Sequence, residues 1–227
     1  MLGGSLLSDK TTVCVEGNIG CGKTTMLKLF KDQVPGVEVL TEPVCKWQNV
    51  RGHNTLGLMY EDPHRWSFAF QSYLQLTMLQ NHTFPSKQPL KLMERSLFSA
   101  RHVFVENLYR SNKMSDAEYA IINEWFDWIF ENMNLNVDRI IYLRTSPQKC
   151  YERIKKRCRS EENCIPLEYL QQIHNLHEEW LMGGSKSNPN SNVVVVDADQ
   201  PLEEMEEIYF KDDATLLHVE RIIEVQS

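Results

Sequence analysis

The stretch EGNIGCGKTT, residues 16–25, holds Gly17, four intervening residues and then Gly22, Lys23 and Thr24, which is the full spacing of a P-loop. Residues 12–15 are apolar or β-branched and predict a buried strand, and residues 25–31 place apolar side chains at helical spacing. A strand, a glycine loop and a helix therefore follow in the order that the motif requires. Such a loop turns backbone N–H groups toward an anion at the helix N-terminus, so the stretch predicts a phosphate-binding site.

We expect this loop to hold the phosphates of a nucleotide. Lys23 should reach the β- and γ-phosphates, and the Thr24 hydroxyl should ligate Mg²⁺. P-loops occur in motors, switches, pumps and small-molecule kinases alike, so the loop by itself leaves the phosphate acceptor open. The predicted nucleotide contacts are Gly17, Asn18, Ile19, Gly20, Cys21, Gly22, Lys23, Thr24 and Thr25.

Length and composition indicate one soluble domain. The chain has 227 residues, of which 42% are hydrophobic and 24% charged, enough to bury a substantial core. The formal net charge of -7 argues against a general nucleic-acid-binding protein, because such proteins need a basic surface. No run approaches the roughly 18 continuous apolar residues of a membrane helix, so we expect neither nucleic acid nor membrane as a partner.

The cysteines and the N-terminus predict an intracellular protein. The six cysteines form no C-x-x-C pair, and Cys14 and Cys21 lie beside or within the glycine loop, which favours reduced thiols. The apolar run in residues 1–10 is too short for a secretory signal, and the segment lacks the arginines of a mitochondrial transit peptide. We expect a cytoplasmic or mitochondrial location, and a lost targeting segment stays open.

Strand-like and helical patterns alternate along the chain, which is typical of a parallel sheet wrapped by helices. We therefore predict an α/β fold with a five-stranded parallel sheet; the near-continuous apolar runs RIIYL and NVVVV fit strands buried on both faces. Strands are predicted at 12–15, 37–41, 90–93, 139–143 and 193–196. Helices are predicted at about 63–82, 97–110, 115–133, 147–158, 166–182 and 201–210, and a polar loop at 183–192.

Charged residues close two of the predicted strands. Pro43 ends the strand at 37–41 and leaves Glu42 at the sheet edge, and Glu94 and Arg95 close the strand at 90–93. Ligands of open parallel sheets gather at the carboxyl ends of the strands. Burying such charges is costly without partners, so these carboxylates are expected to face a ligand, a metal or Arg95. The alternative for both is a helix N-terminal charge or a surface ion pair.

The segment YERIKKRCRSEE, residues 151–162, is the other charge-dense stretch. Arg153 and Arg157 share a helix face, and Arg159 joins them only if the helix ends near Cys158. That geometry suits a lid over a triphosphate. A solvated helix face, or the core of a nuclear-import signal, are the alternatives, and composition alone favours the solvated face.

These residues and several longer blocks resemble the deoxyribonucleoside kinase family over residues 11–199. The resemblance implies a P-loop kinase fold with an arginine-rich lid at about 153–164. It also implies ATP- and Mg²⁺-dependent phosphorylation of the 5′-hydroxyl of deoxyribonucleosides in the salvage of DNA precursors. Beyond the P-loop, it is carried by LTEPVCKWQNV, LGLMYEDPHRW, FQSYLQLTML, LMERSLFSARHVFVEN, IIYLRTSP, RIKKRCRSEE and PLEYLQQIHNLHEEWL.

The resemblance implies a catalytic set. Glu42 matches the general base that takes the proton of the 5′-hydroxyl as that hydroxyl attacks the γ-phosphate. Arg95 matches the arginine that steadies Glu42 and the 5′-oxygen, and Glu94 matches the acidic residue on the Mg²⁺ side. The arginines that match the lid, where they would offset charge on the transferred phosphoryl group, are Arg153, Arg157 and Arg159.

The resemblance also implies a nucleoside pocket. Gln71 matches the glutamine that reads the base, and its amide can serve a thymine edge or, flipped, a cytosine edge. Trp47 and Phe104 match the aromatic walls around the base, and Tyr60 and Glu162 match the pair on the 3′-hydroxyl. The bulk of the residues that shape the pocket favours thymidine and deoxycytidine over purines; these are Leu74, Met78 and Ala100.

Two further properties follow from the family. The predicted helix at 115–133 carries more apolar surface than one core-facing stripe needs, so it forms either a homodimer interface or additional core. Feedback inhibition by thymidine triphosphate is expected, with its base in the nucleoside pocket and its phosphates at the P-loop. His174 and His177 lack the spacing of a zinc helix and are expected to pack or to meet solvent.

Three other functions fit the sequence less well. A GTPase needs N-K-x-D, and the nearest string, NKMS at 112–115, does not supply it. A nucleoside monophosphate kinase such as thymidylate kinase needs cationic groups for the phosphate of its acceptor, whereas TEPVCKW and FQSY favour an uncharged acceptor. A non-catalytic nucleotide-binding protein would have no need of the complete set Lys23, Thr24, Glu42 and Arg95.

Overall fold

The predicted sheet is present in full. The computed structural model describes residues 10–157, 165–183, 192–211 and 217. Within them, the strands form one parallel sheet in the order β2-β3-β1-β4-β5, and each predicted strand is confirmed to within one residue at either end. The strands are β1 (Thr11–Glu16), β2 (Val37–Leu40), β3 (Leu90–Glu94), β4 (Arg139–Arg144) and β5 (Asn192–Asp197).

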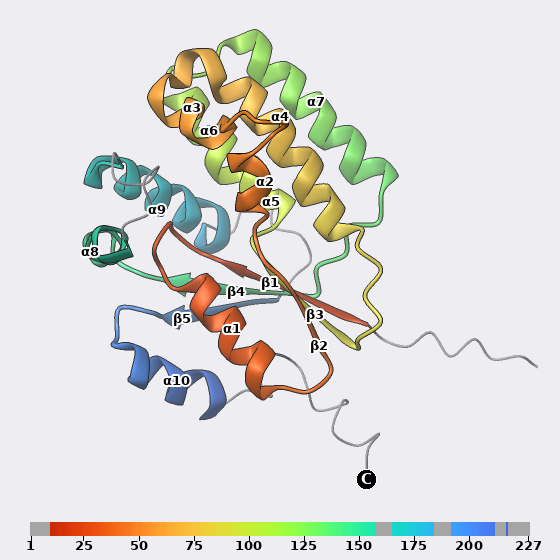
Figure 1. Ribbon diagram of the computed structural model, residues 1–227, viewed down its shortest axis with the longest axis vertical. Coiled ribbons are helices and arrows are strands. Elements are labelled where there is room, and N and C mark those ends of the chain that lie inside the picture. Colours follow the sequence, from red (N-terminus) through yellow and green to blue (C-terminus); the bar gives the residue numbers. More distant parts are fainter. Residues whose placement is uncertain (1–9, 158–164, 184–191, 212–216, 218–227) are drawn as a thin grey trace, which may run out of the picture.

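Helices cover both faces of this sheet (Figure 1). Two lie below it in the view, α1 (Lys23–Gln33) and α10 (Leu202–Lys211). The larger group lies above it and includes α4 (Pro63–His82), α7 (Asp116–Asn132) and α9 (Leu167–Met182), while α8 (Pro147–Arg157) lies at one side. These helices confirm the predicted ones at 63–82, 115–133, 147–158, 166–182 and 201–210.

Shorter helices complete the upper layer. The helix predicted at 97–110 is confirmed as three consecutive pieces, and its middle piece, η1, is a π-helix. The sequence patterns missed α2 and α3, because five to seven residues are too few to show a helical repeat. The short elements are α2 (Val44–Gln48), α3 (Thr55–Glu61), α5 (Leu97–Ser99), η1 (Ala100–Val105) and α6 (Glu106–Arg110).

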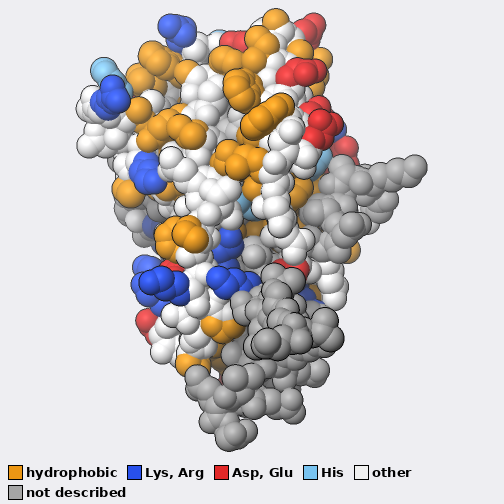
Figure 2. Space-filling model, turned by 90° about the vertical axis from the view of Figure 1, so that its right-hand side faces the viewer, with side chains coloured by type: hydrophobic (Ala, Val, Ile, Leu, Met, Phe, Trp, Pro, Cys, Tyr) orange, Lys and Arg blue, Asp and Glu red, His pale blue; other side chains and the backbone are white. Residues whose placement is uncertain are grey.

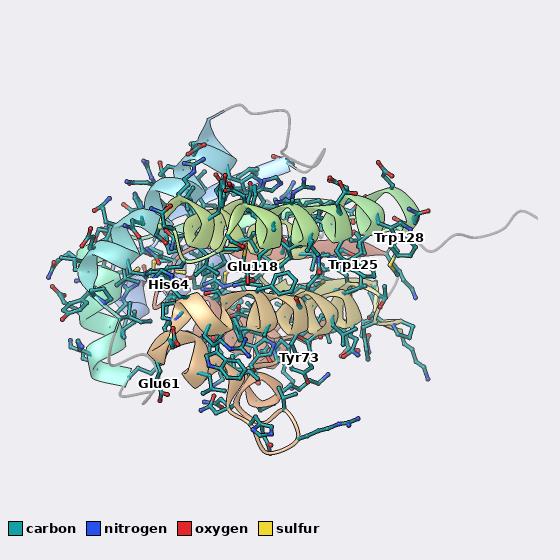
Figure 3. The ribbon with its side chains drawn as sticks, turned by 90° about the horizontal axis from the view of Figure 1, so that it is seen from above. Glu61, His64, Tyr73, Glu118, Trp125 and Trp128 are labelled. Carbon is teal, nitrogen blue, oxygen red and sulfur yellow. The ribbon has the colours of Figure 1, made fainter. Side chains whose placement is uncertain are left out.

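The long helices α4 and α7 lie side by side at the top of the molecule (Figure 3). Ile122, Phe126 and Ile129 of α7 are buried against the layer beneath, whereas Trp125 and Trp128 are exposed. Figure 2 shows the side of the molecule that lies to the right in Figure 1, and hydrophobic side chains gather over its upper part. The surplus apolar surface predicted for this helix is therefore at the surface of the chain.

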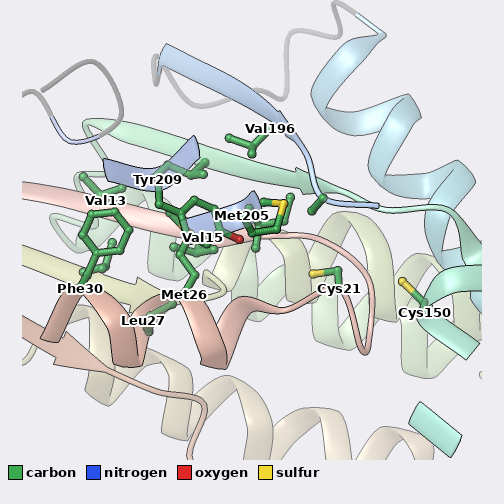
Figure 4. Close-up of a cluster of buried hydrophobic side chains, with 14 of the residues drawn as sticks. Val13, Val15, Cys21, Met26, Leu27, Phe30, Cys150, Val196, Met205 and Tyr209 are labelled. Carbon is green, nitrogen blue, oxygen red and sulfur yellow. The ribbon is translucent and has the colours of Figure 1, made fainter. Parts of the chain in front are cut away.

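The sheet divides the core into two sides. Val13 and Val15 of β1 point to the α1 side, where they pack with Met26, Phe30 and, from α10, Tyr209 (Figure 4). The alternate β1 residue, Cys14, belongs to a second cluster with residues of β4 and α9. A third cluster lies within the upper helical layer. The glycine loop therefore begins at the carboxyl end of a strand that is packed on both faces.

Several predictions fall outside the described residues. Arg159, Glu162 and most of the polar loop predicted at 183–192 lie there, as does most of the segment after residue 211. The lid at 153–164 and a single domain spanning 1–227 stay predictions for this reason. In the part of the chain that the structure describes, no helix combines the length and apolar character needed to cross a bilayer.

Candidate active site

One cavity of about 780 Å³ opens where the parallel strands end. It is lined by the glycine loop, by residues following β2 and β3, and by side chains from α2, α3, α4, η1 and α8. Among the described residues, it brings together every predicted site residue except Gly17 and Asn18. These lining residues are Ile19, Gly20, Cys21, Gly22, Lys23, Thr24, Thr25, Glu42, Trp47, Tyr60, Gln71, Leu74, Met78, Glu94, Arg95, Ala100, Phe104, Arg153 and Arg157.

The glycine loop packs closely against the segments on either side of it. Gly17 has φ 139°, and a Cβ there would lie 2.6 Å from the carbonyl oxygen of Leu143. Gly20 has φ 79°, and its Cβ would lie 2.8 Å from the carbonyl oxygen of Cys150. Only glycine satisfies both the left-handed backbone and the close approach at these two positions. A larger residue at either position would therefore displace the loop from its neighbours.

Gly17 and Asn18, the two loop residues that do not line the cavity, take part in hydrogen bonds that hold the loop in place. The Asn18 amide donates to the carbonyl of Leu170 at 2.8 Å, which ties the loop to α9. The Lys23 ammonium donates to the carbonyls of Gly17 and Asn18 at 3.3 and 2.8 Å. The Asn18 side chain thus has a structural role here, and nucleotide contact by Gly17 and Asn18 stays a prediction.

Arg95 and Glu42 form an ion pair at the cavity wall. Arg95 Nε lies 2.9 Å from Glu42 Oε1, and Arg95 Nη1 donates to the Gly17 carbonyl at 2.7 Å. The guanidinium also lies 4.6 Å from the centre of the Phe104 ring, a cation–π contact. Arg95 is only 4% exposed, so this is not a surface ion pair. The charges predicted at the two strand ends therefore meet one another.

The charge of Arg95 is stabilised by its neighbours. Burial by itself lowers the pKa of the guanidinium, but the negative groups around it, Glu42 first and Glu16 second, together raise it by more, so the net shift is upward. Arg95 is thus a fixed cation beside Glu42. Its backbone is unusual as well, with φ 61° in the left-handed region.

A second oxygen-rich pair lies where β3 ends and α1 begins. The Thr24 hydroxyl donates to Glu94 Oε1 at 2.7 Å, and both residues line the cavity. Glu94 is 5% exposed and is the last residue of β3. A hydroxyl and a carboxylate are hard oxygen ligands, which suit Mg²⁺.

The other half of the cavity has aromatic and amide walls. The Trp47 indole N–H donates to Thr77 Oγ1 at 2.8 Å, and its ring meets Phe70 edge-on at 5.8 Å, so α2 is held against α4. The buried Gln71 side chain has no hydrogen-bond partner for Oε1 among the described residues. An unpaired buried amide oxygen costs free energy until a ligand donates to it. Leu74 lies one helical turn further along α4 and is also buried.

The π-helix η1 carries two of the pocket residues. It begins at Ala100, whose small side chain lines the cavity, and it includes Phe104, which lies against the Arg95 guanidinium. A π-turn shifts the residues after it relative to an α-helix, and such turns are common at functional sites. The sequence pattern could predict a helix here but not this shift.

The two described lid arginines differ in their contacts. Arg153 donates to the carbonyls of Ala198 and Gln200 at 2.8 and 2.9 Å, and to that of Cys21 at 3.3 Å. Arg157, the last residue of α8, is exposed and also lines the cavity. Neither belongs to a purely solvated helix face, since both border the cavity.

Several residues in or near the cavity carry no sequence signal. Glu16 begins the loop motif without belonging to its pattern, yet it is fully buried and hydrogen-bonded to Ser96. Tyr169 of α9 lines the cavity. Lysines missed for lack of a distinguishing pattern are Lys28, Lys149 and Lys156. His177 is buried and stacked on Tyr142, which confirms the expectation that it packs.

A P-loop at the end of a central parallel strand, with an ion-paired carboxylate and an aromatic pocket in the same cavity, defines a P-loop kinase. Comparison with known proteins narrows this class. The family model for deoxynucleoside kinase matches residues 13–218, and this chain belongs to the deoxynucleoside kinase family.

Individual relatives agree with this assignment. Mitochondrial thymidine kinase 2 from Homo sapiens is 58% identical over 200 residues, which cover 88% of this chain and 75% of that protein. Its counterpart from Macaca fascicularis is 56% identical over the same shares. Deoxycytidine kinase from Mus musculus is 40% identical over 194 residues, covering 75% of each chain.

Proposed function

We propose that this protein transfers the γ-phosphate of ATP to the 5′-hydroxyl of pyrimidine deoxynucleosides and so salvages DNA precursors. One observation carries the proposal: a single cavity contains both the P-loop and an aromatic pocket with an unpaired amide, and the Glu42–Arg95 pair lines it. The family name and the names of the relatives support the same reaction class.

The residues of the cavity divide the chemistry between them. Glu42 accepts the proton of the 5′-hydroxyl, late in a loose transition state, so the modest basicity of a carboxylate is sufficient. Arg95 orients Glu42 through the 2.9 Å ion pair. Lys23 and the loop N–H groups bind the phosphates, and Arg153 and Arg157 are placed to offset charge on the transferred group.

Mg²⁺ fits the pair formed by Thr24 and Glu94. Mg²⁺ commonly takes one or two protein oxygens and fills its other positions with water and phosphate, so these two side chains are enough to hold it. When bound, the ion neutralises charge on the phosphates. The protein itself supplies the hydroxyl and the carboxylate, held in place by their mutual hydrogen bond.

Pyrimidine preference follows from the pocket. Gln71 offers one donor and one acceptor, which match a thymine edge in one orientation and a cytosine edge in the other. Leu74 and Met78 are buried side chains on the same helix and limit the space for a larger base. The relatives named for thymidine and for deoxycytidine are consistent with both substrates.

The monophosphate kinase alternative fits less well. It needs a free cation for the phosphate of its acceptor. In the described part of the cavity, the lysines belong to α1 and α8, on the P-loop side, while Arg95 is already paired with Glu42. A non-catalytic nucleotide-binding role would leave the Glu42–Arg95 pair without a purpose.

The deciding experiment is ATP consumption by the purified protein with Mg²⁺, with thymidine, deoxycytidine, deoxyadenosine or thymidine monophosphate offered separately. Turnover with the first two supports the proposal, and added turnover with deoxyadenosine extends it to purines. Turnover with thymidine monophosphate alone would replace it with the monophosphate kinase.

We also propose that the protein is a homodimer joined through the α4 and α7 face. Ala117, Ile121, Trp125 and Trp128 fall within one stripe of α7, and the last three are 50%, 58% and 54% exposed. Figure 3 shows the labelled Trp125 and Trp128 on α7 and Tyr73 on the adjacent α4. A second copy of the chain suits this face. A two-fold axis would pack the apolar stripe of one α7 against the same stripe of the other α7, which would cover the tryptophan side chains of both chains.

Feedback inhibition by thymidine triphosphate is part of the same proposal. The P-loop and the base pocket share one cavity, so one molecule can place its base beside Gln71 and its phosphates at the loop. Such an inhibitor competes with the nucleoside for the pocket.

A mitochondrial or cytoplasmic location is proposed from two observations. The relatives with the higher identities are named as mitochondrial. The described cysteines, Cys14, Cys21, Cys45 and Cys150, are free thiols, as expected in a reducing compartment. Cell fractionation with an antibody to the protein tests this.

A further inference from the structure

Glu16 is a buried carboxyl that the chemistry above does not use. It is the last residue of β1, the central strand of the sheet, and none of its surface is exposed. It does not line the cavity. A buried carboxyl is costly, so a partner is expected to justify its position.

The partner is Ser96, which directly follows Arg95. The Ser96 hydroxyl donates to Glu16 Oε1 at 2.6 Å, across 80 residues of sequence. The other oxygen, Oε2, has no hydrogen-bond partner among the described residues. Ser96 is also the N-cap of α5, where its hydroxyl accepts the Ser99 N–H at 3.3 Å. The Glu16 carboxyl therefore fixes the orientation of a hydroxyl that caps the helix after Arg95.

Three consecutive residues hold Arg95 and Ser96 in place. The Arg95 N–H donates to the Val15 carbonyl at 3.0 Å, the Ser96 hydroxyl donates to Glu16, and Arg95 Nη1 donates to the Gly17 carbonyl at 2.7 Å. The backbone of Arg95 between these contacts is left-handed, with φ 61°, which an arginine adopts only when its surroundings impose it. The Glu16–Ser96 bond is the one contact among the three made by two side chains.

The bond tolerates either protonation state of Glu16. Burial raises the pKa of Glu16 to about 7, although Arg95 and Ser96 partly lower it. A carboxylate and a carboxylic acid both keep an oxygen that can accept from the Ser96 hydroxyl. Glutamine has the same shape and retains an acceptor oxygen, so Glu16→Gln is a conservative replacement.

We propose that Glu16 and Ser96 are positioning residues, which hold the left-handed turn at Arg95 so that its guanidinium reaches Glu42. Glu16 lies outside the cavity and Ser96 borders it, and both act through Arg95. Because Arg95 orients the proton acceptor, their loss lowers turnover and leaves nucleoside binding nearly intact. This inference rests on the proposed function.

The test is steady-state kinetics with thymidine and ATP. Turnover by the unaltered protein tests the proposed function first, and the variants are then compared with it. We expect Ser96→Ala and Glu16→Ala each to lower kcat about 10- to 100-fold, as a misplaced catalytic group does, with the KM for thymidine changed less than about threefold. Glu16→Gln should recover most of the kcat lost in Glu16→Ala.

A double variant and a control sharpen the outcome. If the two residues act through one bond, Glu16→Ala combined with Ser96→Ala should cost no more than either alone. Thr145→Val removes another buried hydroxyl, at the end of β4, which lies outside the cavity and makes no hydrogen bond among the described residues; its kcat should match that of the unaltered protein. Full kcat in both alanine variants, or additive losses in the double variant, would overturn the proposal.

Discussion

At the residue scale, the candidate site depends on how a few charges are paired. Arg95 contacts Glu42, the Gly17 carbonyl and the Phe104 ring at once, so its position is defined from three directions. A carboxylate oriented by such a cation is held ready to accept a proton. The remaining oxygen ligands, Thr24 and Glu94, are oriented by each other.

The role of Glu42 is open to a direct substitution. Glu42→Gln keeps the volume of the side chain and removes the base, so kcat with thymidine should fall at least about 100-fold while thymidine binding is kept. Steady-state kinetics and calorimetric binding measure the two effects. Glu38→Gln, on the strand β2 that precedes Glu42 and outside the cavity, is the matched control and should leave kcat unchanged. Unchanged turnover in Glu42→Gln would remove its assignment as the base.

His82 predicts a pH dependence of stability. Burial first, and Lys91 second, lower its pKa to about 3, and its Nε2 accepts the Leu97 N–H at 3.0 Å, which requires a neutral ring. Between pH 6.5, the ordinary pKa of histidine, and about pH 3, the unfolded chain binds more protons at this residue than the folded chain does. The contribution of His82 to the free energy of unfolding is therefore fully present above pH 6.5 and is lost as the pH falls toward 3.

The measurement for His82 is urea unfolding at several pH values between 7.5 and 4. The free energy of unfolding of the unaltered protein should fall relative to that of His82→Gln by up to about 1.4 kcal/mol per pH unit below 6.5. The difference between the two proteins isolates His82 from the other titrating groups. Curves that stay parallel across this range would contradict the neutral, buried histidine.

At the scale of elements, the pocket is assembled from short helices that need support. The five-residue helix α2 presents Trp47 to the cavity, and a helix of this length has little stability of its own. The hydrogen bond from Trp47 to Thr77 secures it to the long helix α4. The wall that α2 contributes to the base pocket is therefore anchored to α4.

Thr77→Val tests this support. It removes the acceptor for the indole N–H and keeps the shape of the side chain, so we expect the KM for thymidine to rise about 3- to 10-fold with kcat nearly unchanged. Thr83→Val, at the exposed end of α4, makes the same chemical change outside the pocket and should leave KM unaltered. Equal KM values in both variants would mean that the bond does not position the tryptophan.

At the scale of the whole molecule, the sheet and the upper helical layer contribute different parts of the site. The sheet with α1 supplies the P-loop, while the helical layer supplies the base pocket on one side and the exposed indoles of α7 on the other. A homodimer through that layer would leave the P-loop side of each copy free.

The assembly is tested by sedimentation. The unaltered chain should sediment as a species of twice 26.6 kDa, and Trp128→Glu should sediment as a monomer of 26.6 kDa, because it places a charge in the apolar interface. Ile208→Glu, which alters an exposed apolar residue of α10 on the opposite side of the sheet, should remain a dimer. If the unaltered protein sediments as a monomer, the homodimer proposal is wrong.

The shared cavity predicts the kinetics of feedback inhibition. Thymidine triphosphate should inhibit competitively against thymidine, because its base occupies the same pocket, so its apparent inhibition constant should rise in proportion to thymidine above KM. Initial rates at several thymidine concentrations show this. Inhibition that excess thymidine fails to relieve would place the inhibitor elsewhere.

Much of this protein was predictable because its signals are local. The five strands are short apolar runs, and the P-loop is one continuous stretch, so their residues carry the prediction without reference to the rest of the chain. The long helices were found for the same reason. Glu42 and Arg95 could be placed at the cavity because parallel strands present their carboxyl ends at one edge.

The rest was decided by contacts between distant residues. Arg153 donates to carbonyls 45 and 47 residues away, and the partner of Glu16 is 80 residues away, so no pattern near these residues predicts the pairs. The helices α2 and α3 exist because they pack on α4, and the π-turn of η1 has no periodic signal. The sheet, the glycine loop and the family are therefore encoded in local stretches of sequence. Which side chains meet is set by the folded structure, because burial and hydrogen bonding depend on residues that are far apart in the chain.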